Sequence, residues 1–335
     1  MSAARNFTVS KLKLHRIYES KIWQGFPFDP FQVSAVPAEP DENPSGACSK
    51  IDKVYGPFRF PGMPSDRAYT FGSFVMSVDG CIAFPENRDG SQIAKNNRLD
   101  PGGALCDYWI LNLLRSVSGA VILGSASLSR ERYLTGEIFD DDLIACRTDN
   151  GMPAVPLHVV LTRRGKNLAL DHQVFRNPNI PVVIAASSEG ARIIGRKYGS
   201  RVRFLGNIAE TAGPPSPGGL YAMAAEMPAV PLLAGFGSGT EIDAGLLLGF
   251  LRRGGCDKAL IESPSFMVRL MQEKLLDEMF LNTSGIFIGG DSLLLGSGSR
   301  AFTAEDHPHT RVLTIHTHSD SFFYHRYMLD YSETE

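Results

Sequence analysis

The sequence predicts an α/β fold with a mostly parallel central sheet, helices flanking that sheet, and an antiparallel edge. Short apolar segments recur from residue 69 onward, and segments with helical periodicity stand between them. Near the C-terminus, two strand-like segments follow each other without a helical pattern between them, which is typical of an antiparallel edge.

The first predicted strand begins at Tyr69, and its apolar run continues to Phe84. One of its faces is mixed and the other is mostly apolar, as in a strand that is buried on both sides. Asp79-Gly80 interrupts the run and predicts a turn or bulge, which places backbone amides and a carboxylate beside the core. A ligand suits that arrangement, but the dipeptide alone favours a plain hairpin turn.

The later elements alternate in the same way. Residues 107–116 predict a helix whose apolar face holds Trp109, Ile110 and Leu113. Polar residues predict a loop at 85–103, and glycines and prolines predict a mobile connection at 206–219. Further strands are predicted at 119–123, 157–161, 180–186, 202–205, 258–262, 279–288 and 311–317, and further helices at 188–198, 240–253 and 265–274.

Residues 1–68 are predicted to form a proline-rich N-terminal arm, and residues 69–335 the main domain. Leu12, Leu14 and Ile17 predict one short strand or helix face, and the many prolines of this segment disfavour a core of its own. We interpret it as an arm that wraps a surface or a partner subunit. A lid over a substrate is the alternative.

Net charge and cysteine usage exclude several classes of function. The 335 residues carry a formal net charge of −3, so nothing indicates nucleic-acid or anionic-membrane binding. The five cysteines are scattered and never form a CxxC pair, so we expect buried free thiols in a reducing cytoplasm rather than disulfides or a zinc site. Neither a secretory h-region nor an uncharged apolar run of about 18 residues is present, so no secretion signal or membrane span is expected.

Polar residues follow three of the predicted strands, where α/β proteins bind ligands. The amides and hydroxyls of Gly124 to Ser127 suit a pyrophosphate. Thr162 and Arg163 suit a phosphomonoester, although a solvated basic turn explains them equally well. In the segment Glu262 to Ser265, the serines either cap the following helix or let its amides face a phosphate.

Other polar clusters predict no chemistry. The segment Gly235 to Gly239 lacks a Walker lysine and a Rossmann spacing, so we interpret it as a flexible entry to a helix. His316 and His318 share a strand face without a carboxylate or cysteine at fitting spacing, so we expect a surface or core pair and no metal site. Asp140 to Asp142 predict a solvated loop, and no GxSxG elbow supports a hydrolase.

Five segments in a fixed order carry a resemblance to a known family. Met76 to Ala83 is similar to its first strand, A-x-S-x-D-G-x-I-A, and Ser91 to Ile93 to its S-x-W segment. Leu113 to Ser127 resembles an LR…DAVLVGAGT run, Leu157 to Arg163 a strand that ends in a 2′-phosphate contact, and Glu262 to Ser265 with Leu275 to Glu278 an EGGPT…LVDEL segment. Residues 69–330 thus resemble the riboflavin-biosynthesis reductase family, the C-terminal domain of bifunctional deaminase/reductases, which has the dihydrofolate-reductase-like fold.

The resemblance implies a cytoplasmic, homodimeric oxidoreductase that transfers hydride from NADPH to a ring-opened ribosylaminopyrimidine phosphate. It implies catalytic roles for Asp79 and Glu262, and contacts to the substrate from Ser91, Arg115 and Glu262. The backbone of Val75 and Met76 would lie beside the nicotinamide. The implied NADPH site as a whole comprises Val75, Met76, Gly124, Ser127, Thr162, Arg163, Ser263, Pro264 and Ser265.

Two departures from the family pattern keep a second interpretation open. A single Ser263 stands where the family has Gly-Gly, and Glu131 to Thr135 lack the paired Asp and the proline of DDPxLTxR. No zinc-deaminase signature is present. The alternative is a non-catalytic relative that binds a nucleotide or a flavin-like ligand.

Overall fold

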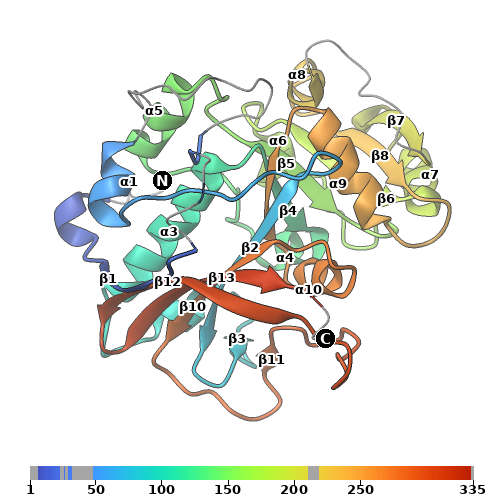
Figure 1. Cartoon of the computed structure of the whole chain (residues 1–335). Coiled ribbons are helices and arrows are strands. Elements are labelled where there is room, and N and C mark those ends of the chain that lie inside the picture. Colours follow the sequence, from blue (N-terminus) through green and yellow to red (C-terminus); the bar gives the residue numbers. More distant parts are fainter. Residues whose placement is uncertain (1–6, 23–25, 27–28, 32–47, 210–218, 333–335) are drawn as a thin grey trace.

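The computed structural model describes residues 7–22, 26, 29–31, 48–209 and 219–332, and it contains one wide sheet (Figure 1). Two short strands, β3 (Cys81–Ala83) and β11 (Leu293–Leu294), pair beside that sheet. The strands of the wide sheet are β1 (His15–Glu19), β2 (Tyr69–Ser77), β4 (Ala120–Gly124), β5 (Leu157–Leu161), β6 (Val182–Ser187), β7 (Arg203–Ile208), β8 (Leu232–Phe236), β9 (Lys258–Glu262), β10 (Glu278–Ser284), β12 (His309–Ser319) and β13 (Phe322–Asp330).

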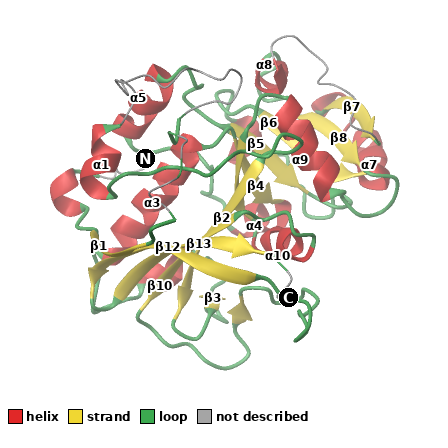
Figure 2. Cartoon of the chain, in the orientation of Figure 1, coloured by secondary structure: helices red, strands yellow, loops and turns green. Residues whose placement is uncertain are grey.

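The order of the strands in the wide sheet is β1-β12-β13-β10-β2-β9-β4-β5-β6-β8-β7. From β10 to β7 every neighbouring pair is parallel, whereas β13, β12 and β1 form an antiparallel edge. Figure 2 shows β12 and β13 side by side on the β10 side of the molecule. The predicted α/β fold with a mostly parallel sheet and an antiparallel edge is confirmed.

Two hydrophobic cores cover the two faces of the sheet. Along β4, Val121 and Leu123 face one core, and Ala120 and Ile122 face the other, as the two-residue period of a strand requires. Helices α3, α5 and α7 pack on the first face, and α8, α9 and α10 on the second. The helices are α1 (Ser49–Val54), α2 (Ser91–Lys95), α3 (Gly103–Val117), α4 (Ser125–Arg130), α5 (Asp141–Asp149), α6 (Gln173–Arg176), α7 (Ser188–Tyr198), α8 (Gly219–Ala225), α9 (Ala244–Arg253) and α10 (Pro264–Gln272).

The N-terminal arm contributes to the first core. Strand β1 pairs with β12, and Phe31, Ile51 and Phe60 are buried together with residues of α3. The arm therefore packs on the main domain as part of one hydrophobic core.

A disulfide and ion pairs fasten the arm to α5. Cys48 forms a disulfide bond with Cys146, which lies 98 positions later in the sequence, and their Cα atoms are 5.5 Å apart. The expectation that all five cysteines are free thiols is therefore wrong for Cys48 and Cys146. The spacing of the cysteines in the sequence could not reveal this pairing. Lys50 Nζ lies 2.7 Å from Asp140 Oδ2, and Asp140 also accepts hydrogen bonds from two amides of the first turn of α5. Asp140 is thus a buried N-cap rather than part of a solvated loop.

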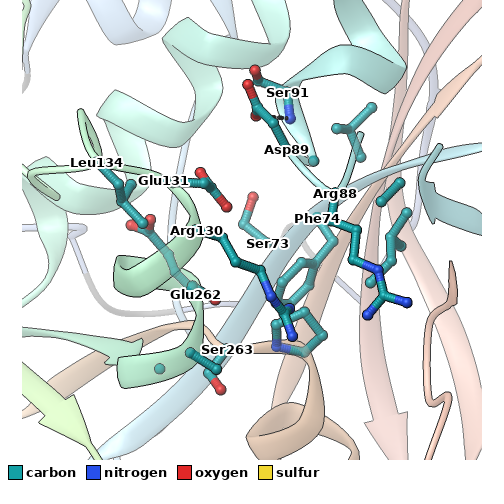
Figure 3. Close-up of a pocket in the computed structure, with 18 of the residues that line it drawn as sticks. Ser73, Phe74, Arg88, Asp89, Ser91, Arg130, Glu131, Leu134, Glu262 and Ser263 are labelled. Carbon is teal, nitrogen blue, oxygen red and sulfur yellow. Dashed lines mark hydrogen bonds between the residues drawn. The ribbon is translucent and has the colours of Figure 1, made fainter. Parts of the chain in front are cut away.

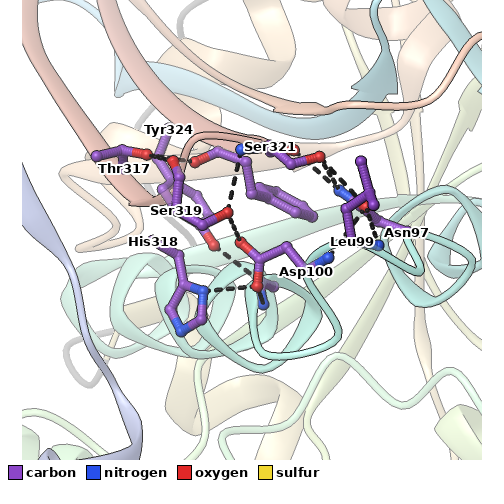
Figure 4. Close-up of polar contacts among 10 residues, drawn as sticks. Asn97, Leu99, Asp100, Thr317, His318, Ser319, Ser321 and Tyr324 are labelled. Carbon is purple, nitrogen blue, oxygen red and sulfur yellow. Dashed lines mark hydrogen bonds and ion pairs between the residues drawn. The ribbon is translucent and has the colours of Figure 1, made fainter.

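The carboxylate of Asp100 joins the β12–β13 turn to the start of α3 (Figure 4). It accepts hydrogen bonds from the backbone N–H of Gly103 at 2.9 Å and from Ser319 Oγ at 2.6 Å, and it lies 2.6 Å from His318 Nδ1. His316 on the same strand is buried, with Nε2 2.9 Å from the carbonyl oxygen of Tyr55. Both histidines therefore have structural partners.

No group of three or more histidine, cysteine, aspartate and glutamate side chains among the described residues could hold a metal ion. None of the helices in the described ranges has the length and apolar character that a bilayer crossing requires.

Candidate functional site

A large cleft opens where the parallel strands end (Figure 3). Its volume is about 2370 Å³, and residues at the C-terminal ends of β4, β5 and β9 and in β2 line it. Helices α2 and α3 and parts of the segments 130–139 and 293–299 line its other sides. Because α/β sheets bind their ligands beyond the carboxyl ends of the strands, this cleft is the candidate functional site. All residues of the site predicted from the sequence line it except Met76 and Asp79.

Two serine hydroxyls converge on Gly124 at the end of β4. A Cβ added to Gly124 would lie 3.2 Å from Ser263 Oγ and 3.7 Å from Ser127 Oγ. A side chain at this position would crowd Ser263 Oγ, so glycine lets the two hydroxyls lie close to the backbone. Ser263 precedes α10 but its side chain forms no capping hydrogen bond. The first amides of α10 after Pro264 therefore remain available for an anion.

The end of β5 supplies a hydroxyl and a guanidinium group. Thr162 is buried, and its Oγ1 accepts a hydrogen bond of 3.0 Å from the amide of Gly165, which fixes the turn after the strand. Arg163 is exposed at the rim of the cleft, where its Nη1 lies 2.7 Å from Glu241 Oε1. A surface ion pair of this kind contributes little stability, so Arg163 can exchange Glu241 for a ligand phosphate at small cost.

Arg115 and Glu262 neutralise each other at the inner wall of the cleft. Arg115 Nε and Nη2 each donate to a different oxygen of Glu262 at 2.7 Å, and Nη1 donates to the carbonyl oxygen of Glu137 at 3.0 Å. The side chain of Arg115 is only 1% exposed, and the carboxylate of Glu262 raises the pKa of Arg115 despite its burial. Because this charge is already compensated, Arg115 would act on a substrate through Glu262, and its contact with the substrate stays a prediction.

Asp79 holds the turn between β2 and β3 and does not line the cleft. Its carboxylate accepts hydrogen bonds from Ser77 Oγ at 2.5 Å and from the amides of Ile288 and Gly289 at 3.2 and 2.7 Å. These hydrogen bonds hold the pKa of Asp79 well below its usual range. These contacts fix the turn, and the catalytic role expected of Asp79 stays a prediction. Met76 packs against the second core, whereas its neighbour Val75 lines the cleft.

Helix α2 brings polar side chains to the side of the cleft opposite Ser263 (Figure 3). The predicted loop at 85–103 contains this helix, which begins at Ser91. The amide of Ser91 donates to Asp89 Oδ1 at 2.9 Å, and Lys95 Nζ donates to Ser91 Oγ at 2.6 Å. Ser91 is thus in the cleft as predicted, within a short network that also presents a carboxylate and an ammonium group.

Two cleft carboxyl groups with raised pKa values were missed from the sequence. Burial raises the pKa of Glu131 to about 7, and the charges of Asp89 and Glu262 add to the effect. Burial also raises the pKa of Asp107 to about 6, against a hydrogen bond from Asn282. For Glu131, a signal was available in the dipeptide Leu134-Thr135, which matches the L-T of the family pattern DDPxLTxR. This match marks the segment in which the rest of the family pattern is changed. For Asp107, the sequence offers no comparable signal.

The model of the RibD C-terminal domain family matches residues 68–318. No curated protein matches the chain in sequence. Solved structures resemble it at low sequence identity, and a likeness at that level shows the fold alone.

Three of these structures illustrate the likeness. A diaminohydroxyphosphoribosylaminopyrimidine deaminase/5-amino-6-(5-phosphoribosylamino)uracil reductase from Thermotoga maritima is 19% identical, with a TM-score of 0.50, over 83% of this chain and 59% of that one. RibD from Acinetobacter baumannii is 18% identical, with a TM-score of 0.50, over 79% of this chain and 59% of that one. A pyrimidine reductase-like protein from Corynebacterium diphtheriae is 13% identical, with a TM-score of 0.54, over 84% of this chain and 98% of that one. The chain therefore spans about three-fifths of the length of the first two proteins.

Proposed function

Because the chain belongs to the RibD C-terminal domain family and has its dihydrofolate-reductase-like fold, we propose that it is an NADPH-dependent reductase of a ribosylaminopyrimidine-type substrate in riboflavin biosynthesis. The observation that carries this proposal is the convergence of the Ser127 and Ser263 hydroxyls on the backbone of Gly124, at the end of β4. It lies beside the uncapped N-terminus of α10, whose first backbone amides would donate, with the two hydroxyls, to a dinucleotide pyrophosphate.

Different residues of the cleft would contact different parts of the cofactor. Ser127, Ser263 and Ser265 would hold the pyrophosphate, and Thr162 and Arg163 the 2′-phosphate that distinguishes NADPH from NADH. Val75 on β2 would lie beside the nicotinamide ring. When bound, the cofactor supplies a hydride, and the protein contributes orientation and electrostatics around it.

The substrate would occupy the opposite side of the cleft, near α2 and α3. Ser91 and Glu262 line that side, and both are oriented by hydrogen bonds to neighbouring side chains. Since Arg115 is neutralised, the substrate phosphate would meet the exposed guanidinium groups of Arg88 and Arg130 instead. Figure 3 shows both side chains extending from the wall of the cleft.

Two accompanying proposals concern assembly and location. We propose a homodimer, and the exposed Ile17 and Tyr18 on the edge strand β1 offer an apolar strip for it. Sedimentation velocity measures that state directly. A cytoplasmic location follows from the proposed pathway, whereas the Cys48–Cys146 disulfide weighs against a reducing compartment.

A specific observation supports the non-catalytic alternative. Ser263 is buried and stands where the family has two glycines, so the backbone there is less open to a cofactor than in the family pattern. A relative that binds a nucleotide or a flavin-like ligand without turnover would tolerate that change.

Turnover separates the two functions. The protein is mixed with NADPH and 5-amino-6-(5-phosphoribosylamino)uracil, and the loss of nicotinamide absorbance is followed together with the mass of the pyrimidine. The reductase predicts a stoichiometric gain of two hydrogens by the pyrimidine. NADPH binding without any gain in the mass of the pyrimidine would favour the alternative. The absence of both NADPH binding and turnover would contradict the proposed function.

A further inference from the structure

We propose that the Cys48–Cys146 disulfide is a thiol-exchange site through which a dithiol reductant changes the substrate side of the cleft. The proposal goes beyond the reductase function, since neither cysteine lines the cleft. Three observations support it: the exposure of the pair, the burial of the other thiols, and the contacts that link the bond to the wall of the cleft.

The cysteines of the chain differ in how easily a thiol reagent reaches them. Cys81, Cys106 and Cys256 are free but buried, and burial raises the pKa of Cys106 and of Cys256 to about 12. A thiol with so high a pKa holds almost no thiolate at neutral pH, and the thiolate is the reactive form. Cys146 is half-buried on α5, whereas its partner Cys48 is 5% exposed. A dithiol therefore reaches the pair at Cys146, and the buried thiols do not compete.

The exchange step balances with the dithiol as the only other reactant. A thiolate of the dithiol attacks Sγ of Cys146, the bond between Cys146 and Cys48 breaks, and Cys48 leaves as a thiolate that takes up a proton. The second thiol of the dithiol then attacks the mixed disulfide and releases Cys146, so the dithiol becomes a disulfide. Two electrons and two protons thus pass from the dithiol to the cysteine pair, and an oxidised dithiol reverses the step.

In the oxidised protein, the disulfide and one lysine hold the N-terminal arm against α5, and we call these contacts the arm clamp. The disulfide fixes Cys48 of the arm to the second turn of α5. Lys50 Nζ lies 2.7 Å from Asp140 Oδ2 and 2.8 Å from Asp142 Oδ2, at the start of that helix. Asp140 also accepts a hydrogen bond of 2.9 Å from Trp109 Nε1 of α3. Helix α5 is therefore bound to both the arm and α3.

Residues 137–141, the wall segment, lead directly into α5 and form part of the cleft on the side of α3. Four of them line the cleft, namely Glu137, Ile138, Phe139 and Asp141. The amide of Phe139 donates to Asn112 Oδ1 at 2.6 Å, and its ring stacks on that of Tyr108 with the ring centroids 6.2 Å apart. The carbonyl oxygen of Glu137 accepts from Arg115 Nη1 at 3.0 Å. Because the wall segment continues into α5, the arm clamp restrains it.

Reduction removes the covalent part of the arm clamp and leaves only the ion pairs of Lys50. We expect the wall segment to open more often, so that the arrangement that binds a substrate is populated for a smaller fraction of the time. The predicted cofactor residues Gly124, Thr162 and Ser263 lie at the ends of β4, β5 and β9, outside the wall segment. Reduction should therefore change substrate binding and spare cofactor binding.

Hydrogen–deuterium exchange tests the proposal without turnover. The oxidised wild type is compared with the wild type reduced by dithiothreitol, with Cys48→Ser, and with Cys256→Ala, which removes a buried thiol outside the pair. We expect the amides of residues 137–149 to exchange roughly three- to tenfold faster after reduction and in Cys48→Ser. Cys256→Ala should respond to dithiothreitol as the wild type does. Labelling with iodoacetamide should show that Cys48 and Cys146 become accessible thiols in the reduced, folded protein.

Turnover gives a second readout, which rests on the proposed function. We expect reduction to raise the KM for 5-amino-6-(5-phosphoribosylamino)uracil roughly three- to tenfold in the wild type and to leave the Kd for NADPH unchanged. In Cys48→Ser, dithiothreitol should change neither constant. A pair that dithiothreitol does not reduce in the folded protein overturns this proposal, and so does a reduced pair with unchanged exchange at residues 137–149 or an unchanged KM. A wild type without turnover whose exchange still depends on reduction overturns the proposed function alone.

Discussion

Arg115 and Glu262 form a bidentate ion pair in which both nitrogen–oxygen distances are 2.7 Å, at the boundary between the first core and the cleft. The pair lies where the end of α3 meets the end of β9, so it joins two elements that both line the site. Family resemblance suggests that each residue faces the substrate. From the ion pair we propose a supporting role for Arg115, in which it orients Glu262 and limits the negative charge of the cleft.

Arg115→Ala is therefore predicted to act mainly on stability. The substitution leaves the carboxylate of Glu262 buried without its partner, and we expect a loss of about 3–5 kcal/mol in the free energy of unfolding. Urea denaturation measures this loss. Arg163→Ala removes an exposed ion pair and serves as the control, with an expected change of at most about 1 kcal/mol. Equal losses in the two variants would contradict the supporting role.

Gly124→Ala is predicted to reduce cofactor binding with little effect on stability. The new methyl group fills the space between Ser127 and Ser263 and lies 3.2 Å from Ser263 Oγ. We expect the Kd for NADPH to rise about tenfold or more, which corresponds to about 1.4 kcal/mol. Gly62→Ala, where a Cβ meets nothing within 4 Å, is the matched control. An unchanged Kd in Gly124→Ala would place the pyrophosphate elsewhere.

Cys48→Ser is predicted to destabilise the protein by about 2–4 kcal/mol under non-reducing conditions, because the Cys48–Cys146 bond closes a long loop of the unfolded chain. Cys146→Ser should lose the same amount, and the double variant no more than either. Denaturation of the wild type with a reductant should reproduce the loss. If the reductant does not change the stability of the wild type, and if the wild type is only as stable as Cys48→Ser, the disulfide bond does not form.

Glu131→Gln is predicted to flatten the pH dependence of stability. The folded-state pKa of about 7 exceeds the ordinary value of 4.5, so between these values the folded protein holds a proton that the unfolded chain has released. Stability of the wild type therefore falls as the pH rises through this window, by on the order of 3 kcal/mol from this group. Glutamine does not titrate, so the stability of the variant relative to that of the wild type should rise from pH 4.5 to pH 7. Parallel curves would contradict the raised pKa.

The sequence predicts well those elements whose apolar run is short and bounded by polar residues. Strands β5 and β9 and helix α7 have the predicted limits, because turn residues flank each of them. Strand β13 was missed because charged and aromatic residues alternate along Phe322 to Asp330, so the sequence lacks a continuous apolar run there. Strand β8 was missed because its five residues belong to a longer apolar segment that also contains α8. Part of the predicted mobile connection, residues 210–218, lies outside the described residues.

The site was predictable only where it depends on strand ends. Gly124 ends a strand, and Thr162 and Ser263 each follow one directly, so topology alone brings them to one edge of the sheet. The pairing of Arg115 with Glu262 and the environment of Glu131 depend on side-chain packing between elements far apart in sequence. The surroundings of Asp79 could not be predicted, because an Asp-Gly turn has the same sequence whether its carboxylate faces a ligand or, as here, the amides of a neighbouring loop.

The central claim, that this cleft binds NADPH, is tested most directly by titrating the protein with NADPH and with NADH while following nicotinamide fluorescence. The account predicts saturable binding of NADPH, weakened roughly five- to tenfold by Arg163→Ala because a charge-assisted contact to the 2′-phosphate is lost. Binding of NADH should be unchanged in that variant. Arg164→Ala, whose side chain pairs with Glu189 away from the cleft lining, is the control and should bind both cofactors as the wild type does. An absence of NADPH binding at high micromolar concentration would contradict the account.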